Sequence, residues 1–265
     1  MSTLTVENLT KEYGDVTAVS DVSFEVEDEF VVLLGESGAG KSTLLRCVNG
    51  LTEPTSGGVY LDGDPVSGSR PAIGMIFQQH NLVEGVSAYL NALTGSLERT
   101  SLVDSLLQWN DEEDKRKALE ALQTVGLLDE AHQRVSQMSG GQQQRVGIAR
   151  ALVQDPSLVL ADEPVASLDP SSAESVMGYL KKAAGVHQVT ALVSLHQVNI
   201  AAYFGERFIG LRDGELLFDV EQGDLTAELI DDLYGDVETV GLAERHATDA
   251  RPAETAAPRE ARMGR

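Results

Sequence analysis

The chain has 265 residues, 42% of them hydrophobic, so it is long enough to bury a substantial core and is expected to be a soluble globular protein. Its apolar runs are far shorter than the roughly 20 residues of a membrane-spanning helix, and the N-terminal MSTLTVENLTKEYG lacks the apolar stretch of a signal peptide. The 42 acidic and 20 basic residues give a net charge of −22, which disfavours binding to nucleic acid or to anionic lipid.

The first part of the chain alternates between apolar and polar residues and predicts strands at residues 2–7, 16–26 and 30–34. The third strand, FVVLL, is followed by the glycine-rich LGESGAGKST and by KSTLLRCVNG, which predicts a helix closed by Gly50. Strand, loop and helix match the Gly-x4-Gly-Lys-Ser pattern of the Walker A loop, in which backbone N–H groups and a helix N-terminus face one anion. The loop alone does not separate kinases, GTPases, helicases and transport ATPases.

We expect this loop to hold the phosphates of a nucleotide. Lys41 supplies a positive charge for the β- and γ-phosphates, and the Ser42 hydroxyl can be a ligand of Mg²⁺. The expected nucleotide contacts of the loop and of the helix start are Gly35, Glu36, Ser37, Gly38, Ala39, Gly40, Lys41, Ser42 and Thr43. The alternative, a glycine-rich turn without a ligand, is less favoured because the strand and the helix stand where the motif requires them.

Later segments predict an α/β chain with a helical insertion. GGVYLDG and AIGMIFQ predict strands, and from Asn81 to about Arg150 the periodicity is helical, most clearly in DEEDKRKALEALQTVGLL. SLVLADEP and VTALVSLH are short apolar runs typical of parallel sheets, with a helix predicted between them at about 170–184. RFIGLRDGELLFDV predicts a hairpin at Asp213-Gly214, whereas residues 236–265 have no apolar face and are expected to form a disordered tail.

The strand in LVLADEP ends in two adjacent carboxylates, Asp162 and Glu163. Because successive side chains at a strand end point in different directions, the two are expected to serve different partners. Asp162 would hold Mg²⁺ directly or through water, and Glu163 would polarise the water that attacks the γ-phosphate. Alone, the run is compatible with any strand that has a polar end, but beside a Walker A loop it predicts the second half of one site.

A second glycine-rich segment, in MSGGQQQRVGIARAL, stands just before a predicted helix. Ser139, Gly140, Gly141 and Gln142 would form another cradle of N–H groups at a helix N-terminus. One nucleotide does not need two cradles, so this one is expected to serve a nucleotide bound to another copy of the chain. A P-loop kinase, the alternative class, has no use for this segment.

With this segment the sequence resembles the ATP-binding cassette (ABC) family, whose signature is SGGQ. The resemblance implies that Tyr13 stacks on adenine and that Gln78 of the Q-loop is a metal ligand that links the site to the helical insertion. It also implies that Asp169 of the D-loop in ASLDP contacts the nucleotide site and that His196 in SLHQ contacts the γ-phosphate. Each of these assignments is weak alone, because Tyr13 could equally be a surface aromatic, Gln78 a polar loop residue and His196 a structural histidine. Six motifs in the correct order over about 190 residues are nevertheless specific.

The family resemblance implies a fold and a mechanism. The fold is that of a P-loop NTPase, a RecA-like parallel-sheet core with an antiparallel β subdomain and a helical subdomain inserted at about 81–150. Together these form a nucleotide-binding domain over residues 1–235. Two cassettes would meet head to tail as a homodimer, each ATP lying with Mg²⁺ between the Walker A loop of one copy and SGGQ of the other. The dimer would close on ATP, hydrolyse it with the support of Glu163 and His196, and reopen. Gln78 would transmit this motion through the helical insertion to the partner bound there.

Within the family, FQQHNLVEGVSAYLNALTG, EPVASLDP and SLHQV resemble the ATP-binding subunit of phosphonate importers over about residues 1–235. One Walker A loop, no membrane span and an insertion of about 70 residues argue against tandem translation factors, fused exporters and coiled-coil repair ATPases. The resemblance implies polytopic permease subunits and an extracellular or periplasmic substrate-binding protein as partners, and a place on the cytoplasmic face of the membrane. Phosphate, phosphite or another small oxyanion remains open as the cargo, as does a non-transport complex such as cell-division machinery.

Three features depart from the family pattern or leave two interpretations open. Asp28-Glu29 stands where a Gly-Glu turn is expected before the Walker A strand. The acidic excess is spread over the chain, which indicates either adaptation to a salt-rich cytoplasm or an ordinary acidic protein. Trp109, in SLLQWN, is expected either at the seat of a permease helix or as an ordinary packing residue.

Overall fold

The structure, a computed structural model, describes residues 2–68, 70–79, 81–99 and 112–235. Its centre is a six-stranded sheet in the order β10-β9-β3-β8-β7-β6, in which all neighbours pair in parallel except β10 with β9. Its strands are β3 (Phe30–Leu34), β6 (Ile73–Ile76), β7 (Leu158–Asp162), β8 (Thr190–Ser194), β9 (Arg207–Arg212) and β10 (Glu215–Glu221). The carboxyl ends of β3, β6, β7 and β8 therefore meet at one edge, which is where ligands bind in parallel α/β sheets.

A second, antiparallel sheet has the order β2-β1-β4-β5. Its strands are β1 (Thr3–Tyr13), β2 (Val16–Glu27), β4 (Ser56–Leu61) and β5 (Asp64–Pro65). The two long strands β1 and β2 are joined by a two-residue turn, in which Gly14 has a positive φ of 61°. The predicted antiparallel β subdomain beside a parallel-sheet core is thus confirmed.

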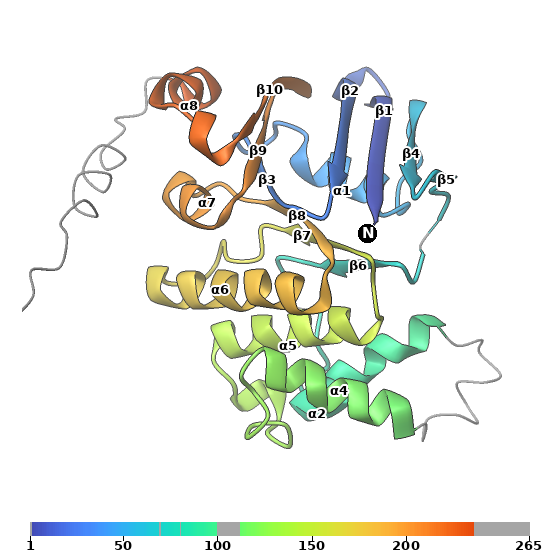
Figure 1. The fold of residues 1–265 in the computed structure, drawn as a ribbon, viewed down its shortest axis with the longest axis vertical. Helices are drawn as coiled ribbons and strands as arrows, with labels where there is room; N and C mark the ends of the chain where they lie inside the picture. The colour runs from blue at the N-terminus through green and yellow to red at the C-terminus, as the bar shows by residue number, and fades with distance from the viewer. Residues whose placement is uncertain (1, 69, 80, 100–111, 236–265) are drawn as a thin grey trace, which may run out of the picture.

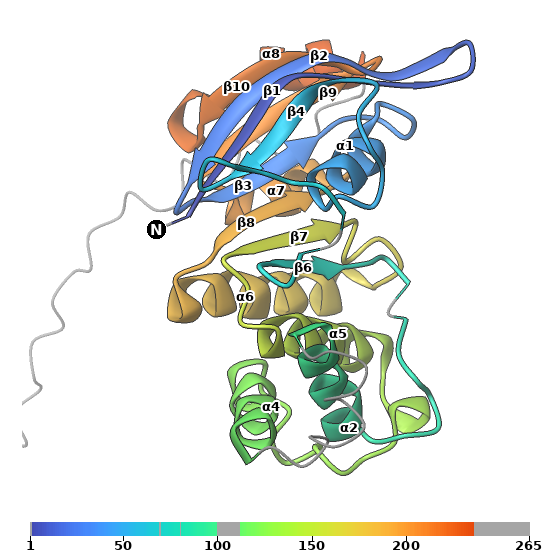
Figure 2. The ribbon, with the colours of Figure 1, turned by 90° about the vertical axis from the view of Figure 1, so that its right-hand side faces the viewer.

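The helices fall into two groups (Figures 1 and 2). In both views α2, α4 and α5 lie together at the end of the molecule opposite β1, β2 and β4. These helices are α2 (Ala88–Leu93), α4 (Glu112–Thr124) and α5 (Gly140–Val153), with 3-10 turns at Thr94–Arg99 and Val135–Gln137. The others are α1 (Lys41–Val48), α6 (Pro170–His187), α7 (Val198–Phe204) and α8 (Ala227–Tyr234), with a 3-10 turn at Gln222–Asp224. Among the described residues, no helix is both long and apolar enough to cross a membrane.

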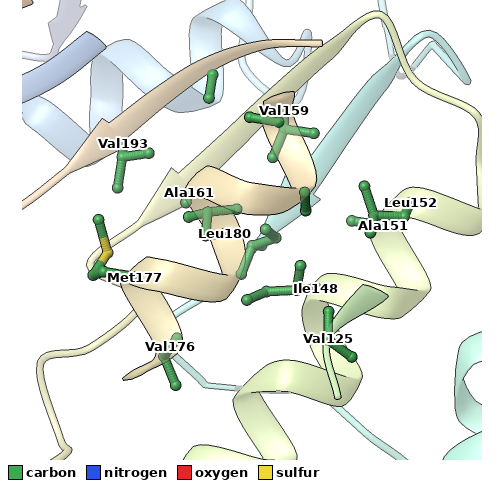
Figure 3. Close-up of a cluster of buried hydrophobic side chains, with 14 of the residues drawn as sticks. Val125, Ile148, Ala151, Leu152, Val159, Ala161, Val176, Met177, Leu180 and Val193 are labelled. Carbon is green, nitrogen blue, oxygen red and sulfur yellow. The ribbon is translucent and has the colours of Figure 1, made fainter. Parts of the chain in front are cut away.

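Two hydrophobic clusters lie on opposite faces of the central sheet, and strand β3 contributes to both. Val32 and Leu34 belong to the cluster that packs against α5 and α6, and Val31 and Leu33 to the cluster shared with α1 and the antiparallel sheet. This division follows from the period of two of a strand, which sends successive side chains to opposite faces. Figure 3 shows the first cluster, where side chains of α5 and α6 meet those of β7. The continuous core holds the phosphate loop at a fixed place above the sheet.

The structure confirms most of the predicted elements and extends two of them. Strand 30–34 has the predicted bounds, and the hairpin at Asp213-Gly214 is present with φ of 53° and 84° at these two residues. The first strand runs to Tyr13 rather than to residue 7, because β1 pairs with both β2 and β4 and its register shifts absorb the irregular pattern. The helix predicted at 170–184 continues to His187.

The turn before β3 explains how the Asp28-Glu29 departure is accommodated. Asp28 adopts a left-handed φ of 49°, a conformation that aspartate tolerates better than most residues other than glycine, and its N–H donates to Thr190 Oγ1 at 3.1 Å. Glu29 Oε1 accepts from Arg207 Nη1 at 3.3 Å. Trp109, the whole of its SLLQWN segment and the tail 236–265 lie outside the described residues. The domain limit at residue 235 stays a prediction.

Candidate nucleotide-binding site

The glycine-rich loop joins β3 to α1 through positions that only glycine fits well. Gly35, Gly38 and Gly40 have φ of 153°, 90° and 99°. A side chain at Gly35 would meet the Leu211 carbonyl of β9, and one at Gly40 would meet the Ala18 carbonyl of β2. Helix α1 begins after Gly40 without a side-chain cap, so its first N–H groups are left to a ligand. The loop is therefore pressed against both sheets and presents bare backbone to an anion.

Lys41 is the buried cation of this loop, with a relative exposure of 4%. Its Nζ donates to the carbonyls of Gly35 at 2.7 Å and Glu36 at 2.9 Å, and lies 3.8 Å from Glu163 Oε1. Burial lowers the pKa of Lys41, whereas the carboxylates of Glu163 and Asp162 act in the opposite direction. A phosphate in the loop would add a further anion beside this ammonium group and would stabilise its charged form.

Asp162, at the end of β7, is fixed by two hydroxyl groups. Ser42 Oγ and Ser194 Oγ both donate to Asp162 Oδ1, each at 2.9 Å. Ser194 is fully buried at the end of β8, and the parallel register places it directly beside Asp162. Ser194 was not among the predicted site residues. The signal in the sequence was a hydroxyl at the end of the otherwise apolar run TALV, in a strand expected to lie beside the one that ends in Asp162.

Glu163 follows in a left-handed conformation with φ of 46°. For a non-glycine residue this costs about 1–2 kcal/mol, and it turns the Glu163 carboxylate away from the direction of Asp162. The Glu163 N–H donates to Ser194 Oγ at 2.9 Å, so one buried hydroxyl holds both the carboxylate of Asp162 and the backbone of Glu163. The result is two adjacent carboxylates with different neighbours, Ser42 for Asp162 and Lys41 for Glu163.

The oxygens of Ser42 and Asp162 fit a magnesium ion. A hydroxyl and a carboxylate are hard oxygen ligands, and Mg²⁺ is commonly held by one or two such groups together with phosphate oxygens and water. The 2.9 Å hydrogen bond between them shows that the two oxygens already converge. Gln78, the third predicted ligand, is exposed two residues after β6, at the same edge of the sheet, because Ile76 pairs with Ala161.

The second glycine-rich segment forms the start of α5. Ser139 caps this helix, since its Oγ accepts from Gln142 N at 3.3 Å while Gln142 Oε1 accepts from Ser139 N at 2.9 Å. Ser139 and Gly140 are exposed. The N–H groups of Ser139 and Gln142 are thus taken up in a capping box that the sequence argument did not foresee, which leaves those of Gly140 and Gly141 for the cradle expected from SGGQ.

Asp169 lies beside this segment as the cap of α6. A side chain on Gly141 would come within 3.4 Å of Ser172 Cβ, in the first turn of α6. The Asp169 carboxylate accepts from Ser172 N at 3.1 Å and from Ser171 Oγ at 2.7 Å. These hydrogen bonds, chiefly that of Ser172, lower the pKa of Asp169 to about 2, so the group is ionised at neutral pH. The starts of α5 and α6 thus form one exposed pair of helix N-termini.

His196 and Tyr13 complete the predicted set at two different places. The His196 ring, two residues after β8, meets the ring of Tyr234 edge to face, with centroids 5.8 Å apart. Tyr234 Oη accepts from Gly35 N at 3.2 Å, which places His196 near the phosphate loop. Tyr13, at the tip of the β1–β2 hairpin, is 48% exposed, and Lys11 Nζ lies 5.0 Å from its ring centroid.

The candidate residues therefore form two groups. The first contains the phosphate loop, Asp162, Glu163, Ser194 and His196, and the second contains the SGGQ segment with Asp169. Within the described ranges, no hydrogen bond or ion pair joins one group to the other. Gln78 and Tyr13 lie at exposed positions outside both networks. One copy of the chain thus carries two separate groups of candidate residues.

Known proteins share both the sequence and the fold. The ABC transporter family model matches residues 19–166. A phosphonates import ATP-binding protein of Haloquadratum walsbyi is 80% identical over 243 residues, covering 92% of this chain and 86% of the relative. One of Halobacterium salinarum is 68% identical over 240 residues, covering 90% and 86%. Both relatives come from halophilic archaea.

Two solved structures show the same architecture. A nucleotide-free ATP-binding cassette of an ABC transporter superposes with a TM-score of 0.75 at 25% identity, covering 89% of this chain and 96% of that one. The dimeric structure of a bacterial ABC transporter cassette superposes with a TM-score of 0.70 at 35% identity, covering 83% and 98%.

Proposed function

The chain belongs to the ABC transporter family, and from this premise we propose that it is the ATP-hydrolysing subunit of an importer for phosphonates. The observation that carries the proposal is the separation of the site into two groups. The phosphate loop with Asp162 and Glu163 has everything needed to bind and hydrolyse ATP except the cradle of Ser139–Gln142. Ser139 and Gly140 of that cradle are exposed beside the start of α6 at Asp169, where a second copy of the chain would reach them.

The first group binds ATP and cleaves its γ-phosphate. The N–H groups of the loop and Lys41 hold the β- and γ-phosphates, and Ser42 and Asp162 would hold a Mg²⁺ ion, which would neutralise negative charge on the phosphate oxygens. Glu163 accepts a proton from the attacking water, and His196 stabilises the γ-phosphate from the end of the neighbouring strand β8. Gln78, at the same edge of the sheet, would add a ligand to the metal and link it to the helical insertion, and Tyr13 would stack on the adenine.

The second group acts on the nucleotide of the other copy. In a head-to-tail homodimer the N-terminus of α5 supplies N–H groups and a positive helix end to the γ-phosphate held by the partner's loop. The dimeric cassette structure, which is 35% identical to this chain, supports the pairing of two copies. Because the γ-phosphate is the group that both copies contact, ATP favours the closed dimer and hydrolysis favours its opening.

The cargo and the partners follow from the relatives. Two relatives at 80% and 68% identity are named phosphonates import ATP-binding proteins, and this identity spans 90% or more of the chain. The cassette would sit on the cytoplasmic face of the membrane, joined through its helical insertion to polytopic permease subunits. A substrate-binding protein outside the membrane would deliver the phosphonate. Nucleic acid is not a partner, in keeping with the charge of −22.

We expect ATP turnover of the assembled importer to respond to phosphonate. The chain would be reconstituted with its permease in vesicles that contain the substrate-binding protein, and turnover would be measured with methylphosphonate, phosphate or sulfate. Methylphosphonate should stimulate turnover most, phosphate less and sulfate not at all, because only a loaded binding protein drives closure of the cassettes. The same complex with Glu163→Gln should show no stimulation. Equal responses to methylphosphonate and sulfate would contradict the assignment of the cargo.

A further inference from the structure

The last helix of the described chain, α8, ends at the nucleotide site. Tyr234, its final residue, places its Oη 3.2 Å from the N–H of Gly35, the first glycine of the phosphate loop, which donates to it. The two residues are 199 positions apart in the sequence. Gly35 is buried, so without Tyr234 its N–H would lack the hydrogen-bond partner that the fold now provides.

The same side chain also contacts His196. The two rings meet edge to face, with centroids 5.8 Å apart and planes inclined by 72°. This is the geometry in which aromatic rings attract each other specifically, through a positive ring edge against a negative ring face. One tyrosine therefore touches both the start of the phosphate loop and the histidine that we place on the γ-phosphate.

Helix α8 is anchored firmly enough to set the position of this tyrosine. Ile230 and Leu233 are buried, with exposures of 4% and 1%, and Thr226 caps the helix by accepting from Leu229 N. At its far end, Arg212 Nη1 donates to the carbonyl of Asp232 at 2.6 Å. Arg212 ends β9, the strand that pairs with β3 directly before the loop. The helix is thus tied to β9, the strand beside the one that leads into the loop.

The chemistry of the phenol suits a neutral contact at an anion site. Burial raises the pKa of Tyr234 to about 12, and the carboxylates of Glu36 and Glu163 act in the same direction. The phenol therefore keeps its proton at neutral pH and accepts from Gly35 without adding a negative charge beside the phosphates.

We propose that Tyr234 is a positioning residue for ATP hydrolysis: it fixes the His196 ring relative to the Gly35 end of the phosphate loop. The proposal rests on the function proposed above, because it assigns His196 to the γ-phosphate. It predicts an effect on the rate of the chemical step rather than on ATP binding, since most phosphate contacts come from Lys41 and the other loop N–H groups. A purely structural tyrosine would instead affect folding alone.

Two substitutions separate the contributions of the ring and the hydroxyl. Tyr234→Phe keeps the ring against His196 and removes the acceptor for Gly35 N–H, whereas Tyr234→Leu removes both. Tyr234→Leu should lower kcat by about 10-fold or more with little change in KM, because misplacing a catalytic group slows the chemistry while substrate binding persists. Tyr234→Phe should lower kcat less. Tyr203→Leu is the matched control, since Tyr203 is 71% exposed on the neighbouring α7 and should leave kcat unchanged.

The position of the His196 ring can be measured without any turnover. The tyrosine ring shifts the NMR signals of the His196 ring protons, which can be assigned from their loss in His196→Gln. The signals should move toward those of a histidine without an aromatic neighbour in Tyr234→Leu and stay nearly in place in Tyr234→Phe and Tyr203→Leu. Thermal unfolding of each variant reports whether it is folded.

A folded Tyr234→Leu variant with the kcat and the His196 signals of the parent chain would overturn the proposal. So would a loss of kcat that only follows the fraction of protein still folded. If the parent chain hydrolysed no ATP, the proposed function would fail, while the NMR comparison would still decide whether Tyr234 positions His196.

Discussion

The Glu163→Gln variant is expected to lose ATP turnover by roughly 10²–10⁴-fold, the range typical of a missing general base. Glutamine keeps the shape of the side chain but cannot take the proton of the attacking water. The backbone contact of Glu163 to Ser194 Oγ does not involve its side chain and should persist, as should the two hydrogen bonds to Asp162. ATP binding should therefore survive, and ATP should hold the dimer closed.

Turnover and dimerisation should be measured on the same sample. Phosphate release gives the rate, and light scattering with and without ATP gives the mass of the particle. Glu215→Gln is the matched control, because Glu215 is an exposed glutamate at the start of β10, outside both groups of site residues. If Glu163→Gln hydrolysed ATP at the normal rate, or stayed monomeric with ATP, Glu163 would not be the general base.

Molar KCl is expected to raise both the thermal midpoint and the ATP turnover of the chain. Residues 236–265 hold six acids and five arginines, so residues 1–235 carry −21 of the total charge of −22. Closing a dimer brings two such surfaces together, and two ATP molecules add further negative charge. The Debye length is about 10 Å at 0.1 M salt and about 3 Å at 1 M, so molar salt screens repulsion across the closing gap.

Salt should weaken the direct contacts to ATP less than it weakens this repulsion. Lys41 is 4% exposed, and its hydrogen bonds of 2.7 and 2.9 Å are no longer than the screening length of about 3 Å at 1 M. The thermal midpoint of a chain this long changes by about 2–4 °C per kcal/mol of stability, so a few kcal/mol of relieved repulsion is easily measured. The halophilic sources of the two relatives agree with this interpretation.

The test is a titration of both quantities with KCl from about 0.1 to 3 M, the range over which the Debye length falls well below the size of the interface. A variant with Glu25→Gln and Glu27→Gln, two exposed acids on β2, should reach its plateau of thermal stability at lower KCl. If the thermal midpoint and the ATP turnover are both highest near the lowest KCl concentration and decline toward molar KCl, the chain is an ordinary acidic protein and the interpretation as salt adaptation is wrong.

The sequence predicted those parts of the site that a local pattern specifies. The phosphate loop, the carboxylate pair after β7 and the helix start at Gly140 each depend on a few consecutive residues, and each is present where expected. The SGGQ segment also gave the second helix N-terminus, because glycines before a helix indicate exposed backbone whatever surrounds them.

The sequence did not reveal contacts between distant segments. Ser194 became a site residue only because β8 lies beside β7 in a register that pairs it with Asp162, 32 residues away. Tyr234 contacts Gly35, which is 199 residues away in the sequence, and the residues around Tyr234 do not indicate that the tyrosine points toward the phosphate loop. The left-handed φ of Glu163 was equally hidden, because it accompanies a hydrogen bond to Ser194 Oγ that exists only once β7 and β8 lie side by side.

The central claim is that each ATP lies between the phosphate loop of one copy and the SGGQ segment of the other. Two variants that are each inactive test it by complementation. Lys41→Ala removes the cation of the loop, and Ser139→Asp keeps a helix cap but places a negative charge against the γ-phosphate. In a mixed head-to-tail dimer, one site carries both defects and the other carries neither.

The decisive measurement is therefore the ATP turnover of the two variants alone and mixed in equal amounts, in KCl that supports closure. Thermal unfolding should first establish that both variants are folded. The account predicts that the mixture hydrolyses ATP clearly faster than the sum of the separate variants. A mixture no faster than that sum would show that each copy works with its own SGGQ segment, and would contradict the account.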